Sequence, residues 1–147
     1  MPKNYYGFLS AAHLLLINDG KVLLARRFNT GYEDGNYSVP SGHVEGDETA
    51  TNALIREVKE ETNIDLDPAN VRMVHIMHRK AENVRLDLFF EAKEWTGELK
   101  ILEPNKCDEL RWFPMDQLPD NTIPYIRSAI ENYLNKSWYS EFGWNKV

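Results

Sequence analysis

The sequence predicts a mixed α/β fold, an α/β/α sandwich in which helices lie on both sides of a mixed β-sheet. Three observations support this prediction. Asn18, Asp19 and Gly20 separate two apolar runs, which is typical of a β-hairpin. Later stretches alternate apolar and polar residues with the period of strands. Two further segments, 48–62 and 124–135, carry apolar residues at the spacing of amphipathic helices.

The strands are expected to follow one another with loops and the first helix between them. The stretch Asn29–Asn36 is expected to be a loop because it contains two glycines. Apolar residues at every second position of 84–90 indicate a strand with one face buried. The expected strands are Phe8–Ile17, Lys21–Arg27, Tyr37–Pro40, Val71–His78, Val84–Lys93, Gly97–Ile101 and Glu109–Phe113.

The two helices carry recognisable start and stop residues. Asp47 is the predicted N-cap of the first helix, because a short side-chain acceptor is favoured there, and Glu48 in the first turn suits the helix dipole. Asn63 follows that helix at a position where a left-handed conformation is common, and Asn adopts it more readily than other non-glycine residues. Pro124 begins the second helix, where its missing N–H costs nothing.

The first helix carries an unusual acidic stripe. Glu57, Glu60 and Glu61 continue its apolar face instead of its outer face. Three half-buried carboxylates repel one another, and desolvation raises their pKa values. A bound divalent cation relieves both effects, so the stripe predicts a site for a hard metal ion such as Mg²⁺. A solvated glutamate-rich face is the alternative, and spacing alone leaves both interpretations open. The apolar face consists of Ala50, Ala53, Leu54 and Val58.

The segment from Gly42 to Ile64 resembles the signature of the Nudix hydrolases, the MutT-like family. That signature sets a glycine, a glutamate, an Arg-Glu pair, an apolar residue, a Glu-Glu pair and a final apolar residue at defined spacings. One position departs from it, because Asn63 stands where the family has glycine. The matching residues are Gly42, Glu48, Arg56, Glu57, Val58, Glu60, Glu61 and Ile64.

The resemblance implies a role for most of these residues. The Gly42 carbonyl and the carboxylates of Glu57, Glu60 and Glu61 are expected to bind divalent cations, Mg²⁺ with Mn²⁺ as the alternative. One of these glutamates, or one from a later loop, is expected to activate the attacking water. Arg56 is expected to pair with the first glutamate of the signature or with a metal-binding carboxylate. The implied reaction is attack of water at a phosphorus of a nucleoside diphosphate linked to another group X.

Residues outside the signature supply further candidates. Arg26 and Arg27 end a strand, and the resemblance implies that at least one of them contacts substrate phosphates, for which a guanidinium is well shaped. Glu103 is preferred to Glu109 as an additional metal ligand because it lies in a turn-like stretch. Asn121 occupies a place where some MutT-like proteins read a purine base. Each has a structural alternative. The arginines could be an exposed strand end, the two glutamates could be solvated loop acids, and the asparagine could simply form a turn.

Composition limits the functional classes. The 147 residues are expected to form a single Nudix hydrolase domain, 1–147, and the net charge of −6 argues against a general grip on a nucleic-acid polymer. Cys107 is the only cysteine, which excludes an intramolecular disulfide and suits a reducing compartment. No targeting segment or membrane span is apparent, so the expectation is a cytoplasmic protein.

The aromatic C-terminus, 138–144, is expected to close the pocket, to pack on the domain or to form a homodimer contact.

Three functions are carried forward. The leading one is a Mg²⁺-dependent, MutT-like pyrophosphohydrolase of a nucleoside triphosphate, because every signature acid is present. The second is a hydrolase of ADP-ribose, nucleotide sugars or dinucleoside polyphosphates, which shares the signature and differs in the pocket. The third belongs to another class, a nucleotide-binding domain that kept the fold and lost catalysis.

Overall fold

The computed structural model describes residues 4–144. Eight strands form one mixed sheet in the order β3-β2-β1-β6-β5-β8, with β4 paired to β1 and β7 paired to β2. The helices are α1, Ala50–Thr62, and α2, Pro124–Leu134, with a short 3₁₀ turn, Pro68–Asn70. The strands are β1 Leu9–Asn18, β2 Lys21–Arg27, β3 Tyr37–Ser38, β4 Ser41–His43, β5 Arg72–Lys80, β6 Val84–Ala92, β7 Cys107–Pro114 and β8 Tyr139–Phe142.

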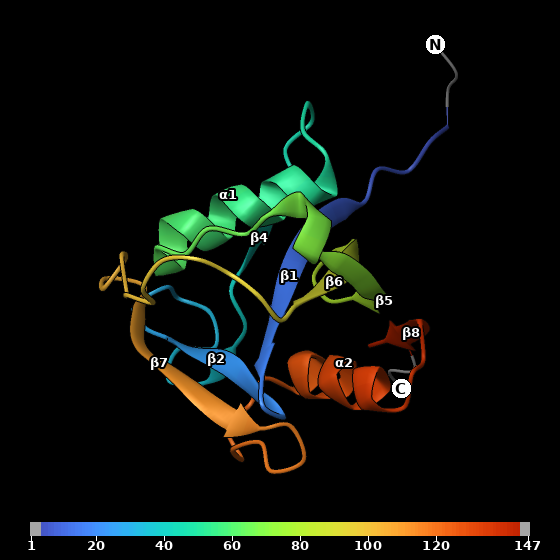
Figure 1. The fold of residues 1–147 in the computed structure, drawn as a ribbon. Helices are drawn as coiled ribbons and strands as arrows, with labels where there is room; N and C mark the ends of the chain where they lie inside the picture. The colour runs from blue at the N-terminus through green and yellow to red at the C-terminus, as the bar shows by residue number, and fades with distance from the viewer. Residues whose placement is uncertain (1–3, 145–147) are drawn as a thin grey trace.

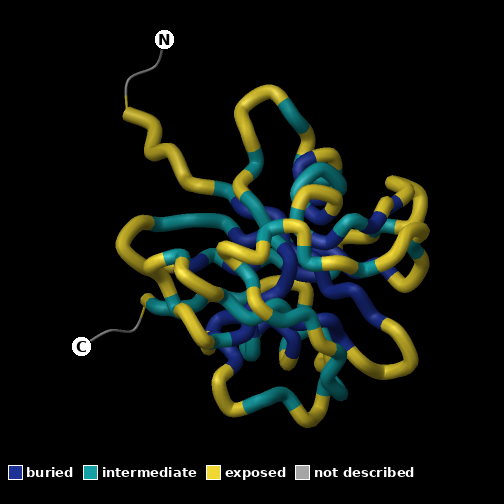
Figure 2. The backbone as a smooth tube through the Cα atoms, turned by 90° about the vertical axis from the view of Figure 1, so that its left-hand side faces the viewer, coloured by how far each residue is buried: buried dark blue, intermediate teal, exposed yellow. Residues whose placement is uncertain are grey.

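The helices pack on opposite faces of β1, which confirms the α/β/α sandwich (Figure 1). Leu14 and Leu16 face α1, where they share a core with Leu54 and Val58. Leu15 faces the other way, into a core built with residues of α2. Burial on both faces explains why residues 14–17 of β1 form a continuous apolar run instead of alternating with polar residues. The buried segments lie at the centre of the tube and the exposed loops at its rim (Figure 2).

Strand β1 also places β4 beside the rest of the sheet. Its first residues pair antiparallel with β4, so that Ala12 is opposite Gly42. The same residues pair in parallel with β6, so that Ala11 is opposite Asp87. Only the end of β1, at Ile17 and Asn18, pairs with β2. Gly42, and with it the start of the acidic segment, therefore lies close to residues of β6 that are more than forty positions away in the sequence.

Helix α1 has a different N-cap from the predicted one. The hydroxyl of Thr49, not the Asp47 carboxylate, accepts a hydrogen bond from the Asn52 N–H at 3.1 Å. The prediction for the other end is confirmed, because Asn63 has a φ of 72° and its N–H donates to the Lys59 carbonyl. The Asn63 amide also donates to the Glu98 carbonyl, which adds a bond that glycine lacks there.

Two strand predictions need correction, and two further strands were not predicted. The segment 97–101 is not a strand, because the N–H of Lys100 donates to the Thr62 carbonyl at the end of α1 instead of to a neighbouring strand. The predicted strand over 37–40 is only two residues long, and the unpredicted β4 follows it. The aromatic C-terminus includes β8, which pairs in parallel with β5, and Trp144 donates from its indole to the His78 carbonyl. This segment therefore packs on the domain.

Among residues 4–144, no helix is both long and apolar enough to cross a membrane.

A buried polar cluster joins three strands of the sheet. Asp87 has no exposed surface, and its two oxygens accept hydrogen bonds from His13 Nε2 at 2.8 Å and Arg79 Nε at 2.6 Å. Burial by itself raises the pKa of Asp87, but the hydrogen bonds and charges of His13 and Arg79 outweigh it and hold the pKa below its usual value. The ionised form of Asp87 therefore stabilises the fold.

Replacing Asp87 with Asn should lower the free energy of unfolding by about 3–5 kcal/mol, because it leaves the Arg79 charge buried without a partner. The folded-state pKa of Asp87 is depressed, so its contribution is complete above the unfolded pKa and disappears as pH falls through the folded one. Urea denaturation at neutral pH and below pH 4 should show the difference shrinking in acid. Asp116→Asn, at an exposed turn, should change stability by less than about 0.5 kcal/mol. A difference between wild type and Asp87→Asn that did not depend on pH would contradict this account.

Candidate active site

The candidate site begins where Gly42 of β4 passes under α1. A Cβ atom added to Gly42 would lie 2.1 Å from Cδ and 2.2 Å from Cγ of Glu57. Such distances do not occur between real side chains, so only glycine lets Glu57 lie against the strand. The reason for the glycine is therefore space for a carboxylate and not an unusual backbone conformation.

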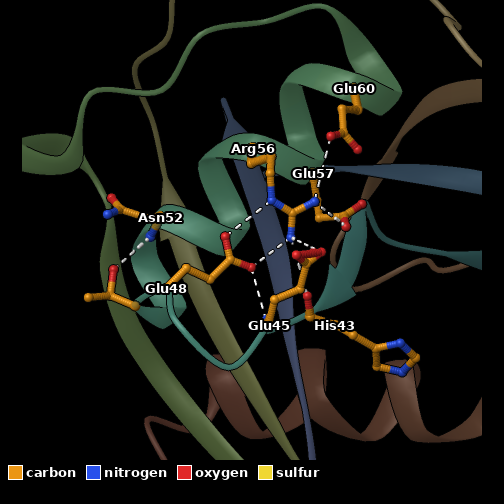
Figure 3. A network of polar contacts seen from close by, with 8 residues as sticks. His43, Glu45, Glu48, Asn52, Arg56, Glu57 and Glu60 are labelled. Atoms are coloured by element: carbon orange, nitrogen blue, oxygen red, sulfur yellow. Dashed lines mark hydrogen bonds and ion pairs between the residues drawn. The ribbon is translucent and has the colours of Figure 1, made fainter.

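Arg56 joins the carboxylates of this region (Figure 3). Its Nε and Nη2 donate to the two oxygens of Glu48 at 3.2 and 2.7 Å, and its Nη1 donates to Glu57 Oε1 at 2.8 Å. Glu60 and Glu45 lie farther out, each with an oxygen 3.6 Å from the guanidinium. These hydrogen bonds raise the pKa of Arg56 above its usual value. The pairing of Arg56 with Glu48 expected from the resemblance is confirmed.

Glu61 lies deeper than the other signature acids. Its Oε1 accepts the N–H of Ser41 in β4 at 3.1 Å. Burial, with smaller contributions from the charges of Glu57, Glu103 and Glu60, raises the pKa of Glu61 to about 8, although the Ser41 hydrogen bond acts in the opposite direction. Four carboxylates from α1 and from the loop before β7 therefore influence one another around Glu61.

This donor set fits a hard divalent cation. Carboxylate oxygens are the ligands that Mg²⁺ prefers, and a cation would favour the ionised form of a buried acid such as Glu61. Within residues 4–144, however, no three acidic or histidine side chains are already gathered at liganding distances. Arg56 holds Glu57 and stands near Glu60 instead. In this arrangement Arg56 binds Glu57 through one carboxylate oxygen, Oε1.

A pocket lined by residues of the paired strands β2 and β7, of β4 and of the end of α1, here called the β2–β7 pocket, brings together several predicted residues. Glu61 and Glu103 line it together with Arg26 and Arg27. The Glu103 carbonyl accepts hydrogen bonds from the N–H groups of residues 106 and 107, which confirms the predicted turn. The pocket places two acids beside two guanidiniums, an arrangement that suits a phosphate bound with its metal ion.

Both arginines already have protein partners. Arg26 donates to the Asp108 carboxylate at 2.8 Å, and this hydrogen bond raises its pKa. Arg27 donates to the Tyr32 carbonyl at 2.7 Å and to the Thr30 hydroxyl at 3.0 Å, so that it holds the loop between β2 and β3. Arg26 is bound by a charged partner and Arg27 only by neutral ones, which leaves Arg27 as the more available cation.

Asn121 and Glu109 are not among the residues that line the β2–β7 pocket. The side-chain amide of Asn121 donates to the Gly35 carbonyl at 2.8 Å, and the backbone carbonyl of Asn121 accepts a hydrogen bond from the Tyr37 N–H. Asn121 thus joins the β2–β3 loop to the segment before α2. Glu109 accepts a hydrogen bond from the hydroxyl of Tyr37. The structure therefore supplies a structural role for each, and base reading by Asn121 stays a prediction.

Sequence reasoning did not single out a second polar region, on the α2 side of β4. Arg79 and Arg85 lie there with Asp87, in a pocket that also contains Arg27 and Gly42. The alternation of residues 84–90 indicates that Arg85 and Asp87 share the face of β6 opposite its apolar residues, but it does not indicate that Asp87 is buried. The burial of Asp87 and Arg79 depends on tertiary contacts with His13 of β1 and Tyr125 of α2, which no local sequence pattern shows.

Comparison with known proteins identifies the family. The NUDIX domain family matches residues 8–133. The NAD-capped RNA hydrolase NudC of Stutzerimonas stutzeri is 31% identical over 133 residues, which are 88% of this chain and 44% of that protein. The chain thus spans about half the length of the curated relatives it matches.

Two solved structures illustrate the shared fold. The MutT NUDIX hydrolase of Burkholderia pseudomallei has a TM-score of 0.78 and 25% identity, with 86% of this chain and 98% of that chain covered. A bifunctional NMN adenylyltransferase/ADP ribose pyrophosphatase of Francisella tularensis, complexed with AMP and a Mn ion, has a TM-score of 0.70 and 18% identity, with 92% and 43% covered. The chain belongs to the Nudix family.

Proposed function

We propose that the chain is a Mg²⁺-dependent pyrophosphohydrolase with a nucleoside triphosphate as its first candidate substrate, as in MutT-like enzymes. The observation that carries the proposal is the acidic face of α1 next to Gly42, with Glu57, Glu60 and Glu61 in reach of one another's charge. Glu57, Glu60, Glu61, Glu103 and the Gly42 carbonyl would hold the cation. Mn²⁺ is the alternative ion, supported by the Francisella tularensis relative with its bound Mn ion.

In this proposal the side chains share three tasks, which are metal binding, proton transfer and phosphate binding. A bound divalent cation neutralises phosphate oxygens and lowers the pKa of a water molecule. Glu57 or Glu60 accepts the proton of the attacking water, and Arg56 orients Glu57 and offsets the crowded negative charge around it. Arg26 and Arg27, in the β2–β7 pocket, bind the phosphates of the substrate. Attack of water on a nucleoside triphosphate would release a nucleoside monophosphate and pyrophosphate.

A dinucleotide with a diphosphate bridge is the second candidate substrate. The NudC relatives support it, because their similarity covers 88% of this chain and their name gives an NAD-capped RNA as substrate. The pocket that contains Arg79 and Arg85 provides space on the far side of Gly42 for a second half of such a molecule. ADP-ribose and nucleotide sugars belong to the same class of substrate. A binding domain without catalysis is the remaining candidate.

Replacing Glu57 with Gln should lower kcat by about 10²–10⁴-fold, because the amide cannot take up a proton and is a poorer metal ligand. The measurement is phosphate and pyrophosphate release with Mg²⁺ across nucleoside triphosphates, ADP-ribose, NAD, nucleotide sugars and NAD-capped RNA. Glu131→Gln, on the exposed side of α2, is the matched control and should retain wild-type turnover. Full activity of Glu57→Gln would exclude this role, and silence of the wild type on the whole panel would favour the binding domain.

Replacing Gly42 with Ala should reduce turnover by about 10- to 100-fold, the size expected when a catalytic group is displaced by about an ångström. The added methyl group would occupy the space of the Glu57 carboxylate and push it away from Arg56. Gly46→Ala is the matched control, because a Cβ atom there meets no other atom within 4 Å. Steady-state kinetics and thermal unfolding should be recorded for both variants. Equal activity of the two would show that the position of Glu57 against β4 has no catalytic importance.

Removal of divalent cations with EDTA should abolish turnover, and addition of Mg²⁺ or Mn²⁺ in excess should restore it. The reason is that the clustered carboxylates need a cation before they can share a site with an anionic substrate. Ca²⁺ should restore less activity, since it accepts more ligands at longer distances and imposes a different geometry. Turnover that persists in EDTA after dialysis would contradict the role proposed for the acidic face.

A further inference from the structure

A second pocket lies on the α2 side of β4 and contains an excess of positive charge. Residues of β1, β4, β5, β6, α2 and the β2–β3 loop line it. Its charged members are Arg27, Arg79 and Arg85, opposed by the single carboxylate of Asp87. We call it the arginine pocket after these three residues. The chain as a whole carries a net charge of −6, so this concentration of guanidinium groups is unusual for the molecule.

Two of the arginines face each other across neighbouring strands. Arg79 of β5 is the direct partner of Arg85 of β6 in the antiparallel register. Like charges in such a pair destabilise a sheet unless other groups neutralise them. Arg79 is neutralised, because its Nε donates to Asp87 and its guanidinium carbon lies 3.6 Å from the ring centroid of Tyr125. The hydrogen bond to Asp87 raises the pKa of Arg79, although burial alone would lower it.

Asp87 has little capacity left for Arg85. One of its oxygens receives Arg79 and the other receives His13. Arg85 donates from Nη2 to the neutral side chain of Asn83 at 2.6 Å, while its Nε is buried and has no partner. Arg27 donates only to neutral oxygens. Within residues 4–144, neither Arg85 nor Arg27 forms an ion pair, so two guanidiniums of the pocket are not neutralised.

An anion would remove both costs at once. It would neutralise Arg85, the member of the cross-strand pair without an ion pair, and accept the hydrogen bond from Arg85 Nε, whose burial without a partner is unfavourable. Guanidinium groups bind phosphate oxygens with paired, charge-assisted hydrogen bonds. The pocket also shares Arg27 and Ser41 with the β2–β7 pocket and contains Gly42. One bound molecule can therefore extend from the acidic face of α1 into the arginine pocket.

We propose that the arginine pocket binds a terminal phosphate group of the substrate, separate from the two phosphates whose linkage is cleaved. This inference rests on the proposed function, because it assigns a second anchoring point to the same substrate. Two sources of such a phosphate are chemically equivalent at this site. One is the third phosphate of a nucleoside triphosphate, and the other is a phosphate on a ribose hydroxyl. Substrates that carry it should bind more tightly than otherwise identical substrates that lack it.

Paired substrates separate the two sources. NADPH and NADH differ only by a ribose phosphate, and a nucleoside triphosphate differs from its diphosphate by the third phosphate. For at least one pair, wild type should show a KM about ten- to a hundredfold lower for the phosphorylated member, the effect of one or two charge-assisted hydrogen bonds. In Arg85→Gln this KM ratio should approach one. Arg111→Gln, which removes an exposed arginine that lines neither pocket, should keep the wild-type ratio.

A binding measurement in EDTA tests the site without any turnover. Inorganic phosphate, titrated calorimetrically, should bind wild type and Glu57→Gln alike and should bind Arg85→Gln at least about tenfold more weakly. Arg85→Gln should also unfold at a temperature no lower than wild type in phosphate-free buffer, because it removes the repulsion from Arg79.

The outcomes distinguish the two proposals. If hydrolysis depends on Glu57 but phosphate binding and the KM ratio are the same in Arg85→Gln and wild type, the arginine pocket is not the phosphate site and the proposed function stands. If phosphate does not bind in EDTA and neither pair differs in KM, the inference is likewise overturned. If phosphate binding requires Arg85 but no diphosphate is hydrolysed, the anion site stands and the proposed function fails.

Discussion

Crowding of negative charge on one helix face is the constraint on which the site depends. Glu57 and Glu61 lie against β4, with Glu60 farther out on the same helix, and the charges of Glu57 and Glu60 add to the cost of ionising the Glu61 carboxyl. Arg56 offsets part of that cost through its hydrogen bonds to Glu48 and Glu57. A planar guanidinium can serve two carboxylates at once, which a lysine ammonium does with less geometric control. The same crowding makes the face receptive to a divalent cation.

Strand β4 converts this local crowding into a site. It is only three residues long, yet it contacts two of the acids. Gly42 leaves space for the Glu57 carboxylate because it has no side chain, and the N–H of Ser41 donates a hydrogen bond to Glu61. On its other side lies the arginine pocket, with Arg79 and Arg85. The acidic residues of α1 and the arginine pocket therefore both contact this one short strand. A phosphorylated ligand with its metal ion needs both kinds of charge close together, and β4 provides that proximity.

Strands that are defined by local sequence patterns were predicted more accurately than elements that are defined by pairing with distant segments. The strands at 8–17, 71–78 and 84–93 were predicted to within a few residues, because their apolar patterns are long and local. Segment 97–101 was assigned as a strand wrongly, since its N–H groups serve the carbonyl end of α1. Strand β8 was missed because it exists only through pairing with β5, about sixty residues earlier in the chain. Short strands have little pattern of their own, so their partners define them.

The sequence by itself determined the chemistry of the acidic face, because Arg56, Glu57, Glu60 and Glu61 are brought together by the repeat of a single helix. It also determined that Gly42 begins that segment, although not that the glycine makes room for Glu57. Only the tertiary structure decided which cations face these acids and which pair with other groups. Charges that meet across strands depend on register, and register depends on the burial of both faces of β1 instead of on any local pattern.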